Sequence, residues 1–121
     1  AKQFADRTHF VHLRSCYIFP DGNFTEASHL GGRGHLIDLC RIFEKAEQEG
    51  KCNSGRRLPM RVDHGMTFTD EPGGVFDESN HGHNAGYTLL GRMFAMGQIQ
   101  GVIATVDDEL GIEYKQPGFY D

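Results

Sequence analysis

The sequence has no tryptophan and few cysteines, and it contains no long apolar run. No run approaches the roughly 20 apolar residues needed to cross a bilayer, and the first ten residues, AKQFADRTHF, lack the apolar segment of a secretory signal. The cysteines are three, Cys16, Cys40 and Cys52, and they form no CxxC pair, so neither a disulfide framework nor a structural zinc site of the usual spacing is indicated. We therefore expect a cytoplasmic protein.

Positive charge is scarce as well. The 12 Lys and Arg stand against 17 Asp and Glu, which gives a net charge of −5, and the one local basic pair is Arg56 and Arg57. Proteins that bind phosphate backbones need clustered Lys and Arg, so nucleic acid is excluded as an expected partner. Of the 121 residues, 38% are apolar, which is enough to pack a core. The length corresponds to one domain or less.

Two segments show the alternation of a buried strand. Residues Thr8–Ser15 alternate around Phe10, Val11 and Leu13, and Leu58–Val62 forms a second such segment with Pro59 placed at its start. A turn-rich stretch at 20–23 and a Gly-rich passage at 29–35 follow the first strand. We expect the first strand to be buried, and both strands to end in polar residues.

Helical spacing follows each strand. Apolar residues from Leu36 to Phe43 predict a helix whose solvated end, residues 44–49, is stopped by Gly50. A second helix is expected from Gly86 or Tyr87 to about Gly97. Residues 101–106 fit a strand or a further helical turn equally well, and residues 107–121 look like a surface extension. The order strand, helix, strand, helix predicts an α/β fold of parallel βα units, in which ligands bind at the carboxyl ends of the strands.

Polar residues stand at those ends. His12 lies in the first strand, where it fits either a hydrogen-bonded core histidine or a metal ligand. Asp63, His64 and Gly65 end the second strand, where they fit either an ordinary turn or a metal ligand beside an acid or base, with the glycine allowing the backbone to turn sharply or to approach a ligand.

Further candidates lie in the connecting segments. His81 and His83 sit in a long loop between residues 65 and 86, as cation ligands or as a solvated stretch. Glu26 and His29 could be metal ligands or substrate contacts, and they fit a capping turn equally well. The GGRG sequence at 31–34 has the composition of an anion-binding nest.

Four ordered blocks resemble the C-terminal part of mannonate dehydratase, a family of xylose-isomerase-like barrel enzymes. They are THFVHLRS at 8–15, GNFTEASHL at 22–30, LPMRVDHG at 58–65 and AGYTLLGR at 85–92. The resemblance implies that residues 1–121 are the C-terminal third of a (β/α)8 TIM barrel, an incomplete barrel in which residues 107–121 are a surface tail. It also implies that two further metal ligands, a His and a Cys, come from strands preceding Thr8, so that the remainder of the barrel is required for a complete site.

The activity implied is metal-dependent dehydration of D-mannonate to 2-keto-3-deoxy-D-gluconate, with Mn²⁺ or Fe²⁺ as cofactor. By resemblance, His12 and Asp63 are the metal ligands, and His64 and Tyr87 are the acid and base pair in an order left open. The implied substrate-binding residues are Arg14, Arg61, Glu26 and His29. The expected partner is a small sugar acid, and a homo-oligomer is compatible with the family.

Two other functions also fit the sequence. The basic GGRGH at 31–35 and the separation of 24 residues (87 − 63) between Asp63 and Tyr87 fit a related sugar-acid lyase or sugar isomerase with another substrate. A small non-enzymatic module that binds a cation through His12, Asp63, His81 and His83 is the alternative outside the enzymes.

Overall fold

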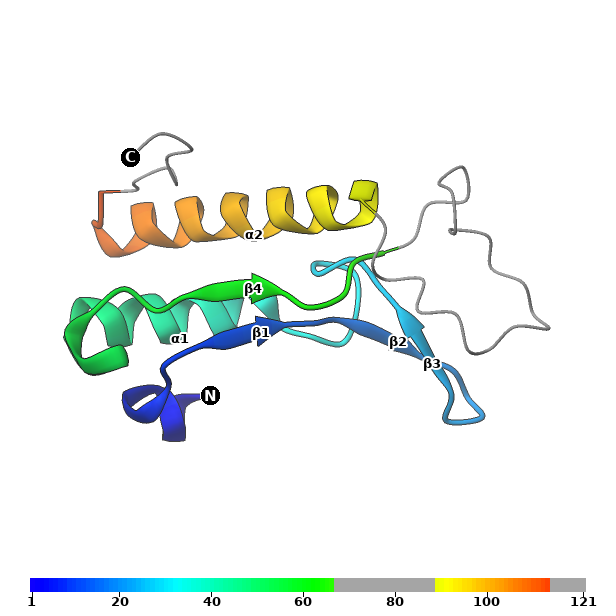
Figure 1. Ribbon diagram of the computed structural model, residues 1–121, viewed down its shortest axis with the longest axis horizontal. Helices are drawn as coiled ribbons and strands as arrows, with labels where there is room; N and C mark the ends of the chain where they lie inside the picture. Colours follow the sequence, from blue (N-terminus) through cyan, green and yellow to red (C-terminus); the bar gives the residue numbers. More distant parts are fainter. Residues whose placement is uncertain (67–88, 114–121) are drawn as a thin grey trace.

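A computed structural model of the chain describes residues 1–66 and 89–113 (Figure 1). Tyr87, His81 and His83 lie outside the described residues, as do most of the long loop and residues 114–121. The elements in chain order are η1 (Lys2–Arg7), β1 (Val11–Leu13), β2 (Cys16–Ile18), β3 (Phe24–Glu26), α1 (Leu36–Gln48), η2 (Asn53–Gly55), β4 (Met60–Val62) and α2 (Leu89–Leu110). The chain is therefore a mixed α/β unit with small sheets.

Strands β1 and β4 pair in parallel, as the strand and helix order predicts (Figure 1). The register places His12 opposite Arg61 and Leu13 opposite Val62, and the Asp63 N–H donates to the Leu13 carbonyl at 3.0 Å. Both strands are shorter than predicted, with β1 spanning three residues of the predicted 8–15 and β4 three of the predicted 58–62. Helix α1 lies between β1 and β4 in the sequence, so the three elements form one βαβ unit.

The main core lies where α1 and α2 meet the helix-facing side of β1 and β4. Successive strand residues point to opposite faces, so Leu13 and Val62 are buried against the helices while His12 and Arg61 take the other face. The buried members of this core are Leu13, Leu36, Cys40, Val62, Ala95, Ile99, Val102 and Val106. The packing of these apolar residues fixes which strand residues are free to form a site.

Helix α1 ends as predicted, with Gly50 in the left-handed region at φ 67° immediately after the C-cap. Its last turns are not fully solvated, however. Glu44 was expected on the solvated end and is instead 5% exposed, and Ala46 is also buried. The prediction for Glu44 was wrong because α2 packs across α1, a contact that residue type alone does not reveal.

Helix α2 corrects a second expectation. The predicted helix end near Gly97 and the predicted tail from Asp107 are replaced by one continuous helix through Leu110, and of the two alternatives for residues 101–106 the helical one is confirmed. Glycine inside a helix costs only about 1 kcal/mol relative to alanine. The buried spacing of Ala95, Ile99 and Val102 more than offsets that cost. Residues 107–110 therefore belong to the helix, and Asp107 is 2% exposed rather than on the surface.

By length and composition alone, α2 would pass as a membrane span, because it has 22 residues and an 18-residue window within it has a mean hydropathy of 1.2. The core helix of a soluble protein passes the same test, and α2 packs along one side on α1 and β4. The helix therefore gives only weak evidence for a membrane span.

Strands β2 and β3 form an antiparallel hairpin that was predicted only as a turn-rich stretch. The turn is closed by the Phe19 N–H donating to the Asn23 carbonyl at 2.8 Å, and Gly22 adopts φ 90°. Figure 1 shows the hairpin at the end toward which β1 and β4 point. Because Cys16 pairs with Glu26, the hairpin returns the chain to the carboxyl end of β1.

Candidate functional site

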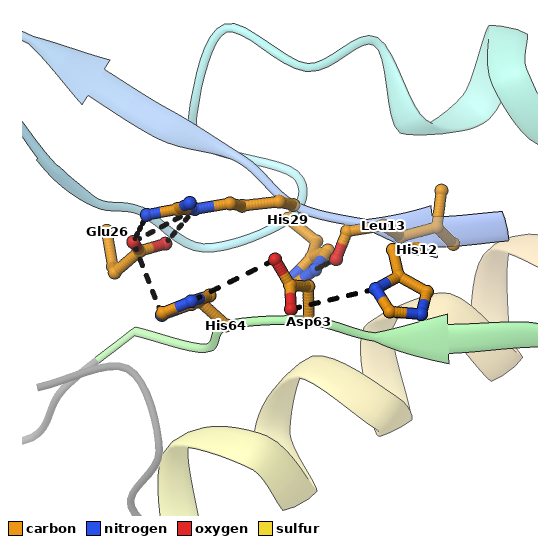
Figure 2. Close-up of polar contacts among 7 residues, drawn as sticks. His12, Leu13, Glu26, His29, Asp63 and His64 are labelled. Carbon is orange, nitrogen blue, oxygen red and sulfur yellow. Dashed lines mark hydrogen bonds and ion pairs between the residues drawn. The ribbon is translucent and has the colours of Figure 1, made fainter. Parts of the chain in front are cut away.

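The candidate site lies where β1 and β4 end, with Asp63 between two histidines (Figure 2). Asp63 Oδ1 is 3.8 Å from His12 Nδ1, and Asp63 Oδ2 is 3.9 Å from His64 Nε2. These three residues, predicted from the strand ends, are therefore brought together. The side chains differ in exposure, at 46% for His12, 25% for Asp63 and 8% for His64.

The alternation along β4 explains this placement. Val62 is buried in the core, so the next residue, Asp63, points to the opposite face, which it shares with His12. Strand β4 ends at Val62, the Asp63 N–H still donates to the Leu13 carbonyl, and His64 then turns toward the hairpin. The carboxylate is thus placed by strand geometry, and the second histidine by the turn that follows.

Gly65 makes that turn possible by a close approach to α2. A Cβ atom at Gly65 would lie 2.6 Å from the Gly91 carbonyl oxygen and 2.8 Å from its carbonyl carbon. Real Cβ contacts are not so short, and the neighbouring atoms are backbone. The sequence predicted a sharp turn or a close approach to a ligand at Gly65, and the structure instead shows a close approach to the backbone at the start of α2.

Glu26 adds a second carboxylate to the site. Its Oε1 lies 3.5 Å from His64 Nδ1, and its side chain is 12% exposed. Arg14 holds it: the Arg14 Nε donates to both carboxylate oxygens, at 3.0 and 3.2 Å, and Nη2 donates to Oε1. The hydrogen bond to Glu26 raises the pKa of Arg14 above its ordinary value. The sequence nominated both residues as substrate contacts, and the structure pairs them with each other.

His29 lies beneath the site rather than open to it. The residue is 2% exposed, and its Nε2 is 2.9 Å from the Leu13 carbonyl oxygen. Because a carbonyl only accepts, Nε2 must carry the proton. The His29 backbone N–H donates to Gln98 Oε1 of α2 at 3.0 Å. His29 therefore ties the segment after β3 to both β1 and α2, and its role as a substrate contact stays a prediction.

Arg61 is not among the residues joined by these contacts. It lines a separate cavity of about 650 Å³ beside β4, together with Arg57 and Arg92 and apolar residues of α2. Its register partner is His12, so strand pairing keeps it on the face of the site. Its contact with a substrate carboxylate likewise stays a prediction.

The GGRG passage is not an anion-binding nest. The N–H groups of Gly31 and Gly32 donate to the Ser28 carbonyl, and those of Arg33 and Gly34 donate to Cys16 and Ser15 acceptors, all at 3.0 to 3.2 Å. All four donors are used to hold the passage against the hairpin. The prediction from glycine content was wrong, because it could not anticipate these internal acceptors.

A metal ion would find suitable donors here but not a full set. His12 and Asp63 offer an imidazole nitrogen and a carboxylate oxygen, which suit divalent manganese or iron. Within residues 1–66 and 89–113, no group of three or more His, Cys, Asp or Glu side chains is arranged to hold a metal. The donor chemistry of the two predicted ligands therefore fits a divalent metal, and the metal itself stays a prediction.

Comparisons with known proteins identify the family of the chain. The profile of the D-mannonate dehydratase (UxuA) family matches residues 1–113. The chain is 36% identical over 112 residues to mannonate dehydratase 2 of Agrobacterium fabrum and 34% identical over 109 residues to mannonate dehydratase of Saccharophagus degradans.

These alignments cover 91% and 88% of this chain but 26% of each relative, so the chain spans about a quarter of their length. The match runs through both parallel strands and the residues that follow them. On the strength of a family match over nearly all of the sequence, the chain belongs to the D-mannonate dehydratase family.

Proposed function

We propose that the polypeptide carrying this segment dehydrates D-mannonate to 2-keto-3-deoxy-D-gluconate, and that the segment forms C-terminal βα units of a (β/α)8 barrel. The observation that carries the proposal is Asp63 lying between His12 and His64 at the carboxyl ends of two parallel strands. In barrels of this type the active site sits at that end of the strands. The choice of D-mannonate as the proposed substrate rests on membership of the family.

His12 and Asp63 would hold Mn²⁺ or Fe²⁺ in this polypeptide. When bound, the metal supplies positive charge that stabilises the substrate carboxylate as its α proton leaves. The partial exposure of both side chains leaves them accessible to an ion. The same face of the sheet carries Arg61, which is the remaining candidate for binding the substrate carboxylate.

His64 and Tyr87 would transfer the protons. One group removes the proton α to the carboxylate, and the other protonates the departing 3-hydroxyl, which leaves as water; the resulting enol becomes the keto acid. His64 is held at 8% exposure between two carboxylates, which limits its rotation and its contact with bulk water. Tyr87 belongs to the same proposal by resemblance and lies outside the described residues.

We also propose the partners of the enzyme and its location in the cell. A small sugar acid is the partner, neither nucleic acid nor membrane is bound, and the protein works in the cytoplasm. The net charge of −5 supports the exclusion of nucleic acid. The rest of the barrel is required for a complete site, because the described residues provide only two of the proposed ligands.

The test is an assay of a full-length polypeptide containing this segment, with D-mannonate and added Mn²⁺ or Fe²⁺, followed by keto-acid formation. We expect conversion of D-mannonate, and the 121-residue segment alone is expected to form no keto acid. A full-length protein that binds the metal but converts other hexonates and not D-mannonate would overturn the substrate assignment. Conversion by the segment alone would overturn the requirement for the remaining barrel.

A further inference from the structure

We propose that Glu26 is a positioning residue that holds the imidazole of His64, and that Arg14 holds Glu26 rather than the substrate. The inference rests on the proposed function to the extent that His64 transfers a proton. It assigns both residues a different role from the substrate contacts expected from the sequence. Three features of the structure carry it: the contacts of the His64 ring, the clamp on Glu26, and the hairpin that brings Glu26 to the site.

The two nitrogens of His64 face two different carboxylates. Nδ1 is 3.5 Å from Glu26 Oε1, and Nε2 is 3.9 Å from Asp63 Oδ2 (Figure 2). A carboxylate beside one ring nitrogen favours the tautomer with its proton on that nitrogen and fixes the plane of the ring. Distances slightly beyond a hydrogen bond are usual before substrate binds. Glu26 therefore selects an orientation in which Nε2 faces the Asp63 side of the site.

Arg14 fixes the carboxylate of Glu26 in turn. A guanidinium that meets both oxygens of a carboxylate sets the plane of that group as well as its position. The other side of Arg14 is also engaged, because its Cζ lies 5.3 Å from the centroid of the Phe24 ring. A substrate carboxylate would have to displace Glu26 to take the same donors.

The β2–β3 hairpin places Glu26 beside Arg14 and close to His64. It begins two residues after Arg14 and returns so that Glu26 pairs with Cys16, and the Ala27 N–H donates to the Ser15 carbonyl at 3.0 Å. A Cβ at Gly32 would lie 2.9 Å from the Ala27 Cβ, so the Gly-rich passage packs closely behind the hairpin. The hairpin thus brings together Arg14 and Glu26, which are 12 residues apart, beside His64.

The first experiment measures kcat, KM and metal content of the full-length polypeptide with Glu26→Ala and Glu26→Gln. Loss of a carboxylate that orients a histidine of a site typically lowers activity by about 10- to 100-fold. Glu26→Ala should therefore lower kcat by about that factor, with KM for D-mannonate and metal content nearly unchanged. Glu26→Gln keeps an acceptor oxygen opposite Nδ1 and should recover part of kcat. A rise in KM with unchanged kcat would show that Glu26 binds substrate and would overturn the proposal.

A matched control comes from another Arg–Glu pair in the same chain. Arg41 of α1 donates to both oxygens of Glu109 of α2, at 2.8 and 2.9 Å. Glu109→Ala removes an ion pair of the same kind without touching His64, so it should leave kcat at the wild-type value. An equal loss of kcat in Glu109→Ala and Glu26→Ala would mean that general destabilisation explains both, against the proposal.

Arg14 is tested by a double-mutant comparison. If Arg14 acts through Glu26, Arg14→Ala adds no further change in kcat or KM once Glu26 is already Ala. A further rise in KM of tenfold or more in the double variant would show direct substrate binding by Arg14.

A second readout is independent of turnover and so separates this proposal from the proposed function. The ¹⁵N resonances of the His64 ring, assigned by their loss in His64→Asn, report which nitrogen carries the proton. We expect a proton on Nδ1 in the wild type and a redistribution toward Nε2 in Glu26→Ala. An unchanged ring spectrum in Glu26→Ala would overturn the positioning role whether or not the protein dehydrates D-mannonate.

Discussion

Replacing Glu44 by Gln is predicted to stabilise the chain at neutral and higher pH. Glu44 of α1 and Asp107 of α2 are 5% and 2% exposed, and their side chains meet between the helices. Burial, together with the negative charges of Asp107 and Glu47, raises the pKa of Glu44 to about 7 against the opposing effect of Arg57. Asp107 Oδ1 has no hydrogen-bond partner among the described residues, and a protonated Glu44 supplies the missing donor.

The magnitude follows from the pKa difference. The pKa of Glu44 is 4.5 in an ordinary environment and about 7 in the fold, so between these pH values the unfolded chain releases a proton that the folded chain keeps. Stability therefore falls as pH rises from about 4.5 to about 7 and then stays constant, a total loss of about 3 kcal/mol at about 1.4 kcal/mol per pKa unit. Gln cannot ionise and keeps an N–H donor for Asp107, so the variant avoids this loss.

The assay is urea unfolding of the wild type and Glu44→Gln between pH 5 and pH 8. The difference in free energy of unfolding should grow by about 2 kcal/mol across this range in favour of the variant. Glu109→Gln is the control: the pKa of Glu109 is lowered by its hydrogen bond to Arg41, so its removal should give no stabilisation at pH 8. A difference between wild type and Glu44→Gln that does not change with pH would refute the reasoning.

Three further predictions concern the site and the core. Gly65→Ala should lower the free energy of unfolding by about 1 to 3 kcal/mol, measured by urea titration, because its Cβ would clash with the α2 backbone; unchanged stability would contradict the close approach. In the full-length polypeptide, Asp63→Asn should lower bound metal, whereas His64→Asn should abolish turnover with metal content near normal; the reverse metal analyses would exchange their roles. Cys40 is fully buried and its pKa is raised to about 12, chiefly by burial, so a thiol-specific disulfide reagent should modify it only after unfolding, whereas rapid native labelling would place it at the surface.

The parallel strands and their polar ends were predictable because the signals are local. Alternation around Val11 and Leu13, and again before Val62, marks buried strands, and the residues that end them are adjacent in sequence. Parallel strands bring their carboxyl ends to one edge, so His12 and Asp63 had to lie near each other once the strands paired. The sequence thus sufficed for the half of the site that the two strands position directly.

The contact of Glu26 with His64 could not be predicted in the same way. It depends on a hairpin of two three-residue strands whose large side chains, Tyr17, Ile18 and Phe24, are exposed, so no alternating burial pattern marks it. The full length of helix α2 could not be predicted for the opposite reason. Its glycines are local signals for a helix break, and the packing of the helix on α1 overrides them. In both cases the deciding interaction joins residues far apart in the sequence.

The peptide group of Leu13 connects the predictable part of the site to the rest. Its carbonyl accepts the Asp63 N–H at 3.0 Å and lies 2.9 Å from His29 Nε2, while its side chain is buried against the helices. One residue therefore joins the end of β1, the end of β4, the segment after β3 and the core. A shift of β4 by one residue would break this junction and would also turn Asp63 into the apolar core in place of Val62. Because burying an unpaired carboxylate is costly, the packing of the core itself enforces the register that places Asp63 between the two histidines.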